Sequence, residues 1–261
     1  MKSAIRRQAL RAATLAYRGL HLVRGSRNGL RILMYHAVGS VVDDDRRGLY
    51  SIAPHLFEQH LDLLMDRHAK QLVSLDSHAL VGDESCIALT FDDGYRDNLV
   101  IAAPLLAARS IPFAVFVSTG AVSARQGGFL DPQELQELGR IPGARIGSHG
   151  VSHRRLTECD NHQLRNELVG SKAYLEDLLG KSVDAVSYPH GAVDRRVRDA
   201  AEAAGYLLGA TSRFDVNLAG RDPLLLSRAE IWRDDDLACL EQKLRGDWDW
   251  YRWRHDDPAG Q

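Results

Sequence analysis

The chain has 261 residues, 44% of them hydrophobic and 26% charged, which is typical of a soluble globular protein. Its formal net charge of -2 gives no overall attraction for nucleic acid, so we expect no nucleic-acid partner. The three cysteines form no Cys-x-x-Cys pair, so neither a disulfide framework nor a zinc knuckle is indicated.

The first predicted element is a basic amphipathic helix or extension over residues 1–28, where every charged side chain is basic. Such a helix packs on the domain or lies on an anionic membrane surface, and its mostly alanine apolar face favours packing. Arginines interrupt every run that resembles a secretion signal, and no stretch reaches the roughly 20 apolar residues of a membrane span. We therefore expect a cytoplasmic protein, with peripheral contact at the inner face of the membrane as an alternative.

Short apolar segments alternate with amphipathic helical segments over the rest of the chain. The expected strands are 31–38, 71–75, 86–91, 112–118, 145–148, 184–188, 206–211 and 225–232. The expected helices are 54–67, 97–109, 132–139, 160–179, 194–204 and 235–245. This alternation indicates a parallel sheet with crossover helices, and seven or eight such units in about 230 residues favour one α/β barrel.

Several polar side chains lie at or just past the ends of these expected strands. In a parallel barrel the reactive groups lie on the loops at the C-terminal ends of the strands. Scattered polar residues would not share that placement. The side chains concerned are His36, Asp92, Asp93, His149, His153 and His190.

Two adjacent carboxylates, Asp92 and Asp93, follow the strand at 86–91 and precede Gly94. Carboxylates this close repel each other, and the pKa of one rises unless a cation lies beside them. A metal ion bound by one would leave the other free as a base. Alone, this motif is weak, because Asp-Gly is also a common turn.

The pair His149 and His153 can present two imidazoles to one ion. With Asp93 it forms a set of two histidines and one carboxylate, which suits catalytic zinc and is also accepted by Fe²⁺. The segment 187–191 reads Ser-Tyr-Pro-His-Gly and is either a plain strand-to-helix turn or a place where backbone approaches a ligand.

The order of Thr-Phe-Asp-Asp-Gly at 90–94, Ser-His-x-x-x-His at 148–153 and Tyr-Pro-x-Gly at 188–191 resembles the polysaccharide deacetylases of carbohydrate esterase family 4, the NodB-homology domain. Leu-Met-Tyr-His at 33–36 and Leu-Ser-Arg at 226–228 also look like family segments. The resemblance implies a distorted (β/α) barrel of seven or eight parallel strands. We place this barrel at 29–246, between the extension 1–28 and an aromatic, acidic tail at 247–261.

The resemblance implies a metal-dependent hydrolase that removes N-acetyl groups from a polysaccharide, oligosaccharide or glycolipid, with O-acetyl groups as the less favoured alternative. Its implied setting is exopolysaccharide or cell-envelope biosynthesis. Asp92 would be the general base, and Asp93, His149 and His153 would bind Zn²⁺, or else Co²⁺, Ni²⁺ or Fe²⁺. A backbone N–H near His190 would hold the oxyanion. The residues expected to contact substrate are Tyr188, Pro189, His190, Gly191 and Arg228.

Two departures from the family pattern affect these roles. Ser187 stands where the family commonly has an arginine that braces the base, and Arg228 is the candidate to supply that charge from a later strand. The family's late general-acid histidine has no counterpart, so His36 or His190 would replace it. We favour His36, whose alternative is a buried histidine satisfied by backbone.

Two other functions stay open at this point. One is a catalytically silent carbohydrate-binding relative, and the other is a deformylase or deacylase of a lipid-linked sugar. The aromatic segment 247–253 is expected to pack over the barrel, although stacking on sugar rings or lying at a membrane interface is an alternative.

Overall fold

A single parallel sheet organises the protein. The computed structural model describes residues 13–14, 17–18, 27–41, 45, 48–76, 84–254 and 257–258. Within them, seven strands lie in the order β8-β7-β6-β5-β4-β1-β9, and every neighbouring pair is parallel. The strands are β1 Leu30–Tyr35, β4 Cys86–Phe91, β5 Phe113–Val117, β6 Ala144–Ser148, β7 Ala185–Ser187, β8 Leu208–Ala210 and β9 Ala229–Glu230.

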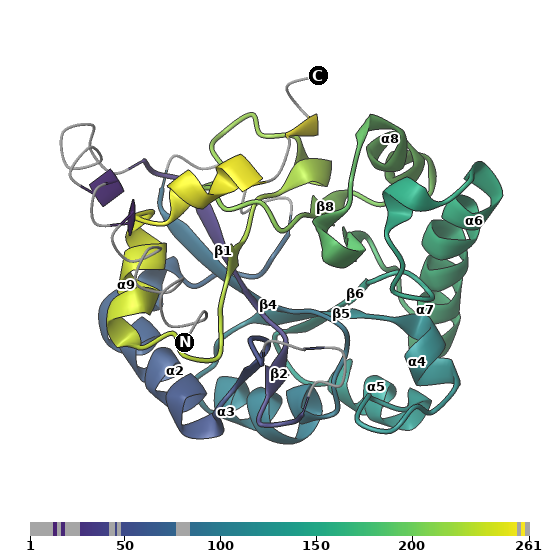
Figure 1. The fold of residues 1–261 in the computed structure, drawn as a ribbon. Helices are drawn as coiled ribbons and strands as arrows, with labels where there is room; N and C mark the ends of the chain where they lie inside the picture. The colour runs from purple at the N-terminus through teal and green to yellow at the C-terminus, as the bar shows by residue number, and fades with distance from the viewer. Residues whose placement is uncertain are drawn as a thin grey trace.

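Helices cover the outside of the curled sheet (Figure 1). They are α2 Pro54–His68, α3 Ala103–Ala108, α4 Thr119–Ser123, α5 Pro132–Leu138, α6 Asn161–Arg165, α7 Ser171–Leu179, α8 Arg195–Ala203 and α9 Leu237–Arg245. A small second sheet pairs β2 Ala37–Val38 with β3 Ser51–Ile52. The distorted (β/α) barrel expected from the sequence is confirmed, with seven parallel strands.

The central strands β4 and β5 are almost entirely apolar because both faces of the sheet are covered. On β1, Leu33 and Tyr35 belong to the large core beneath the helices, whereas Leu30 and Ile32 belong to a smaller core. The smaller core also takes side chains from β4, β5 and β8. This alternation is the two-residue period of a strand that packs on both faces.

One short segment joins the two edges of the sheet. Leu226 forms a parallel bridge with Ala210 at the end of β8, and its amide donates to the Gly209 carbonyl at 2.7 Å. Three residues later, Ala229 pairs with Leu33 of β1. The segment therefore closes the barrel, and Arg228 lies in the middle of the closure.

Two predicted helices contain a wider turn. The expected helix at 160–179 is continuous, but its middle section η5, Asn166–Gly170, is a π-helical turn between α6 and α7. The expected helix at 97–109 likewise begins with a π-helical turn, η3 Asn98–Ala102, before α3. Such turns occur frequently at functional sites.

Two strand predictions are wrong in extent. The expected strand at 71–75 is only an isolated bridge between Leu72 and Ile87. The expected strand at 225–232 is reduced to β9 and the bridge at Leu226, because the segment spans the gap between two edges instead of lining one.

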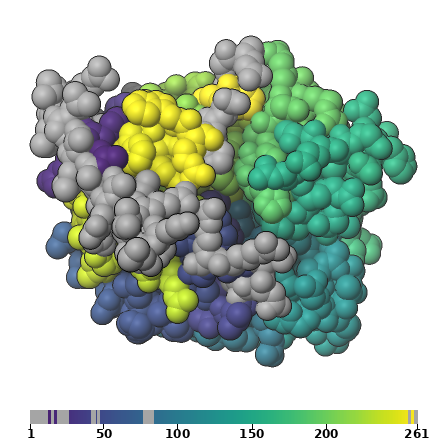
Figure 2. Space-filling view, viewed as in Figure 1, coloured from purple at the N-terminus to yellow at the C-terminus, as the bar shows by residue number. Residues whose placement is uncertain are grey.

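The C-terminal tail packs over the barrel, as expected. Trp248 and Tyr251 are buried, and the Tyr251 ring lies 5.1 Å from that of Phe214. Figure 2 shows the C-terminal part of the chain in yellow, lying against the body of the protein. Trp250 Nε1 donates to Thr14 Oγ1 at 3.1 Å, so the described part of the N-terminal helix packs on this tail.

Most of the helix predicted over residues 1–28 lies outside the described residues. Residues 13–14 and 17–18 are helical. Among the helices that the structure describes, none has the length and apolar character needed to span a membrane.

Candidate active site

The candidate residues gather at one end of the barrel. Asp92 and Asp93 directly follow β4, His149 follows β6, and His36 follows β1. These strands are parallel neighbours or near neighbours in the sheet, so their C-terminal ends share one rim.

Three of these side chains are close enough to share one cation. Asp93 Oδ1 lies 3.4 Å from His149 Nε2 and 3.2 Å from His153 Nε2. All three ligand atoms lie within 4.8 Å of one another. This is the only such group of His, Cys, Asp or Glu side chains that the described part of the chain contains.

The hydrogen bonding of His149 leaves its Nε2 available to a ligand. Its Nδ1 lies 2.8 Å from the Ser187 carbonyl oxygen, which can only accept, so the proton is on Nδ1. A neutral His149 therefore points a lone pair at Asp93 Oδ1, which is buried and has no hydrogen-bond partner among the described residues. Acceptors facing one another in this way fit a bound cation, and a fixed second nitrogen is usual for metal-binding histidines.

The backbone turns at unusual angles to aim these ligands. Asp93 has φ 74° and His153 has φ 54°, in the left-handed region that residues with a side chain seldom adopt. Each such residue costs about 1–3 kcal/mol and persists only where its surroundings hold it. At Asp93, the left-handed turn at the strand end places the second carboxylate on the histidine side.

Both carboxyl groups are held in the ionised form. Burial alone would raise the pKa of Asp93, but a proton or positive charge facing it from His149 and His153 outweighs burial and holds that pKa well below its usual range. When His149 carries its proton on Nδ1, a cation between these groups would act in the same direction. Burial also raises the pKa of Asp92, and the Arg228 guanidinium outweighs it, so the net shift is again downward.

Arg228 binds both carboxylate oxygens of Asp92. Its Nη1 and Nη2 donate to Asp92 Oδ1 and Oδ2, each at 2.7 Å, which is a bidentate pair. Asp92 is 3% exposed and Arg228 is 0% exposed. Ser187 Oγ donates to Asp92 Oδ2 at 3.0 Å, and Arg228 Nη2 donates to the same hydroxyl at 2.8 Å. The arginine missing from the third motif is thus replaced in space by one from the barrel closure.

His36 follows Tyr35, whose carbonyl accepts from the Asp92 amide at 3.0 Å, so His36 lies at the same rim as the two carboxylates. Its Nδ1 is buried and has no hydrogen-bond partner among the described residues. The ring lies 4.6 Å from that of Tyr50. The expected alternative, a histidine satisfied by backbone, does not account for that nitrogen.

His190 takes a different position. It is exposed, its ring lies 4.5 Å from that of His153, and its Nε2 is 3.1 Å from the His153 carbonyl oxygen. Although the side chain reaches the surface, the atoms packed around its ring desolvate it in part, and this desolvation, followed by the neighbouring His153, lowers the pKa of His190. It lies on the outer side of the ligand group.

Three of the residues expected to contact substrate have buried side chains. Tyr188 is 0% exposed, and its hydroxyl donates to the Leu224 carbonyl at 2.9 Å. Arg228 is equally buried and faces Asp92. Pro189 is also buried, which leaves His190 and Gly191 as the surface residues of that segment. Burial of Tyr188, Pro189 and Arg228 does not support substrate contact through their side chains, and a motif position does not reveal which way a side chain is buried.

Sequence reasoning also missed Asp97. Its Oδ2 accepts hydrogen bonds from the amides of Val38 and Ser40, at 2.8 and 3.0 Å, and so holds the turn after His36. The only signal in the sequence is that Asp97 follows Asp93 by four residues.

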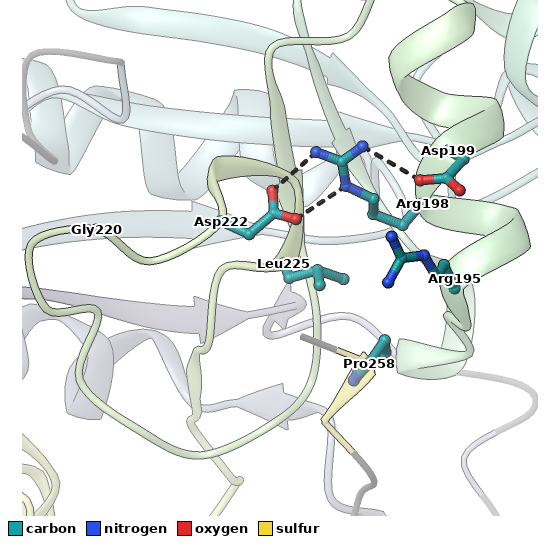
Figure 3. A pocket seen from close by; sticks show the side chains of 7 residues that line it. All are labelled: Arg195, Arg198, Asp199, Gly220, Asp222, Leu225 and Pro258. Carbon is teal, nitrogen blue, oxygen red and sulfur yellow. Dashed lines mark hydrogen bonds and ion pairs between the residues drawn. The ribbon is translucent and has the colours of Figure 1, made fainter. Parts of the chain in front are cut away.

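A pocket of about 390 Å³ lies elsewhere, beside α8 (Figure 3). Arg198 in its wall is bonded to Asp222 and Asp199, so these charges compensate each other. None of the predicted site residues lines it. The full lining is Arg195, Arg198, Asp199, Gly220, Asp222, Leu225 and Pro258.

Comparison with known proteins agrees with this geometry. Residues 80–209 match the family model named polysaccharide deacetylase. YxkH of Bacillus subtilis (strain 168), named as a candidate polysaccharide deacetylase, is 27% identical over 198 residues, which is 74% of this chain and 67% of that protein.

Solved structures show the same fold. The deacetylase PplD of Streptococcus pyogenes, in complex with acetate, matches with a TM-score of 0.73 and 26% identity over 82% of this chain and 97% of that one. IcaB from Ammonifex degensii matches in fold, with a TM-score of 0.68 and 22% identity over 85% of this chain and 97% of that one.

Proposed function

Because this chain belongs to the polysaccharide deacetylase family and is a carbohydrate deacetylase, we propose that it hydrolyses N-acetyl groups on a glycan in a metal-dependent reaction. One observation carries the proposal: the ligand atoms of Asp93, His149 and His153 lie within 4.8 Å of one another. Asp92, the residue before Asp93, is held ionised by Arg228. The similar PplD was solved with acetate, the acid that this reaction would release.

Two imidazoles and one carboxylate leave coordination positions open, as catalytic zinc sites do. Zn²⁺ is our first choice, and Co²⁺, Ni²⁺ or Fe²⁺ suit the same donors. A cation held there would polarise the acetyl carbonyl and lower the pKa of a water molecule.

Asp92 acts as the general base in this proposal. Its Oδ2 accepts from Arg228 and from Ser187, whereas its Oδ1 accepts only from Arg228 among the described residues. An ionised carboxylate oxygen has two acceptor positions, so Oδ1 retains one for the proton of the attacking water. Arg228 disfavours the protonated carboxyl group, so that proton is passed on instead of being retained.

His36 is our candidate for the proton donor to the leaving amine. It follows Tyr35, whose carbonyl accepts from the Asp92 amide, and its buried Nδ1 has no partner among the described residues. For the oxyanion we assign the His190 amide, because the amides of Tyr188, Gly191 and Ala192 already donate to carbonyls.

The test is release of acetate from an N-acetylated oligosaccharide. We expect a chelator to abolish release, and Zn²⁺ or Co²⁺ to restore it. Asp92→Asn should be inactive, whereas Asp199→Asn, an exposed carboxylate beside the remote pocket, should match wild type. An O-acetylated counterpart tests the choice of bond. Release that survives both chelation and Asp92→Asn would reject the proposal.

A further inference from the structure

A buried carboxylate holds the loop between the two histidines. Glu167 has a side chain that is 4% exposed. Its Oε2 accepts hydrogen bonds from the amides of Val151 and Ser152, at 2.7 and 3.0 Å, and its Oε1 accepts from Ser152 Oγ. One carboxylate thus binds three donors from the loop that separates His149 from His153.

The carbonyl groups of this loop are also hydrogen-bonded. The carbonyls of Gly150 and Val151 accept from the amides of Thr119 and Gly120 at the start of α4, at 3.1 and 2.8 Å. The loop backbone is therefore bonded on both sides. Gly150 has φ 74°, and a Cβ there would lie 2.8 Å from Glu167 Oε2, so the loop and the carboxylate are fitted closely to each other.

The π-helical turn connects Glu167 to the residue before His149. The Glu167 carbonyl accepts from Ser171 Oγ at 2.5 Å, and that hydroxyl lies 2.6 Å from Ser148 Oγ. Ser148 Oγ in turn accepts from the Gly150 amide at 3.1 Å. The π-helical turn is therefore bonded both to the histidine loop and, through Ser171, to the end of β6. These two sets of contacts account for a wide turn at this position in the helix.

The two histidines depend on this loop to different degrees. His149 is 2% exposed, and the Ser187 carbonyl fixes its ring. The side chain of His153 is 40% exposed, and its backbone holds φ 54°. The loop positions the backbone of His153, and Glu167 holds that loop.

We propose that Glu167 is a positioning residue for the cation site, which aligns His153 with His149 and Asp93 before the ion binds. This inference rests on the proposed function, since it concerns the same ligands. It predicts that the reach of the Glu167 side chain matters more than its charge. An amide of the same length keeps an oxygen facing the two loop amides, whereas a shorter carboxylate draws back from them.

The test measures Co²⁺ binding to metal-stripped protein by titration calorimetry and by the absorption spectrum of the bound ion. We expect Glu167→Asp to weaken binding by about 10–100-fold and to alter the spectrum, as loss of an outer contact does. Glu167→Gln should stay within about fivefold of wild type, because its amide oxygen keeps both backbone bonds. It loses the charge, and with it the pairing with Arg154, and its NH2 group donates to Ser152 Oγ where Oε1 now accepts.

Glu176 offers a matched control on the same helix. Its Oε1 also accepts from a loop amide, that of Val183, at 2.9 Å, and from Lys172 Nζ at 2.8 Å. None of these bonds involves the histidine loop. Glu176→Asp should change Co²⁺ affinity by no more than about twofold, since sites without shared partners act independently.

The outcomes separate this inference from the function on which it rests. The inference is overturned if Glu167→Asp binds Co²⁺ like wild type, if Glu167→Gln is the weaker variant, or if Glu176→Asp loses as much affinity. If wild-type protein binds no Co²⁺, or if His149→Ala binds it equally well, the proposed function fails and this inference fails with it.

Discussion

Replacing Arg228 by methionine is the most direct test of the arrangement around Asp92. The guanidinium is fully buried, and its bidentate pair with Asp92 compensates a carboxylate that is itself 3% exposed. Removing one partner of a buried ion pair leaves the other charge unpaired, which costs about 3–5 kcal/mol. At about 2–4 °C per kcal/mol for a chain of this size, Tm should fall by about 6–20 °C.

In Arg228→Met, the contribution of Asp92 to stability should also depend on pH with the opposite sign. In wild type the pKa of Asp92 is lowered, so its contribution to stability is present above the unfolded pKa and is lost as pH falls through the folded pKa. Arg228→Met removes the largest influence that opposes burial, so we expect the pKa of Asp92 to rise. The variant then loses stability as pH rises through that pKa, so the gap to wild type should be widest near neutral pH and should narrow on acidification.

The assay is thermal unfolding of metal-stripped protein from neutral to acidic pH, with Arg198→Met as the control. Arg198 pairs with Asp222 at 2.8 Å, but both side chains are more than one-fifth exposed, so their pair is worth at most about 1 kcal/mol. Equal losses of Tm in the two variants, with a gap that does not vary with pH, would refute the account of Asp92.

Three further predictions concern the reaction itself. Asp92→Asn should lower kcat by about 10²–10⁴-fold while Zn²⁺ affinity changes little, and a parallel loss of affinity would argue against its role as a base. His149→Ala should weaken Zn²⁺ binding by more than the roughly 100-fold that loss of an outer contact costs, as measured by competition with a chromophoric chelator. His36→Gln should lower kcat by about 10²–10⁴-fold with Zn²⁺ affinity retained, whereas a purely structural histidine would lower Tm and leave kcat intact.

The fold was predictable because its signals are local. The strand β5, Phe113–Val117, is apolar at every position and buried at every position, as a strand covered on both faces must be. At the end of α7, Gly180 adopts φ 66°, a conformation in which glycine is favoured, and the helix stops there. The expected strand at 71–75 failed because an apolar run of that length does not specify whether a neighbouring strand edge is free to pair with it.

Part of the candidate site was equally accessible from the sequence. Asp92 and Asp93 are adjacent, and His149 and His153 lie four residues apart, so each pair is brought together by a single strand end. Because parallel strands present their C-terminal ends at one rim, the two pairs were expected to meet.

The partners of these groups were decided by the tertiary structure alone. Arg228 reaches Asp92 across 136 residues, because the segment that carries it closes the barrel beside β1 and β8. Glu167 reaches the histidine loop because a π-helical turn directs it there. Periodicity and spacing report how a segment folds on itself and which face it buries. The partner that satisfies a buried charge depends on how distant segments pack together, and local pattern carries no record of that packing.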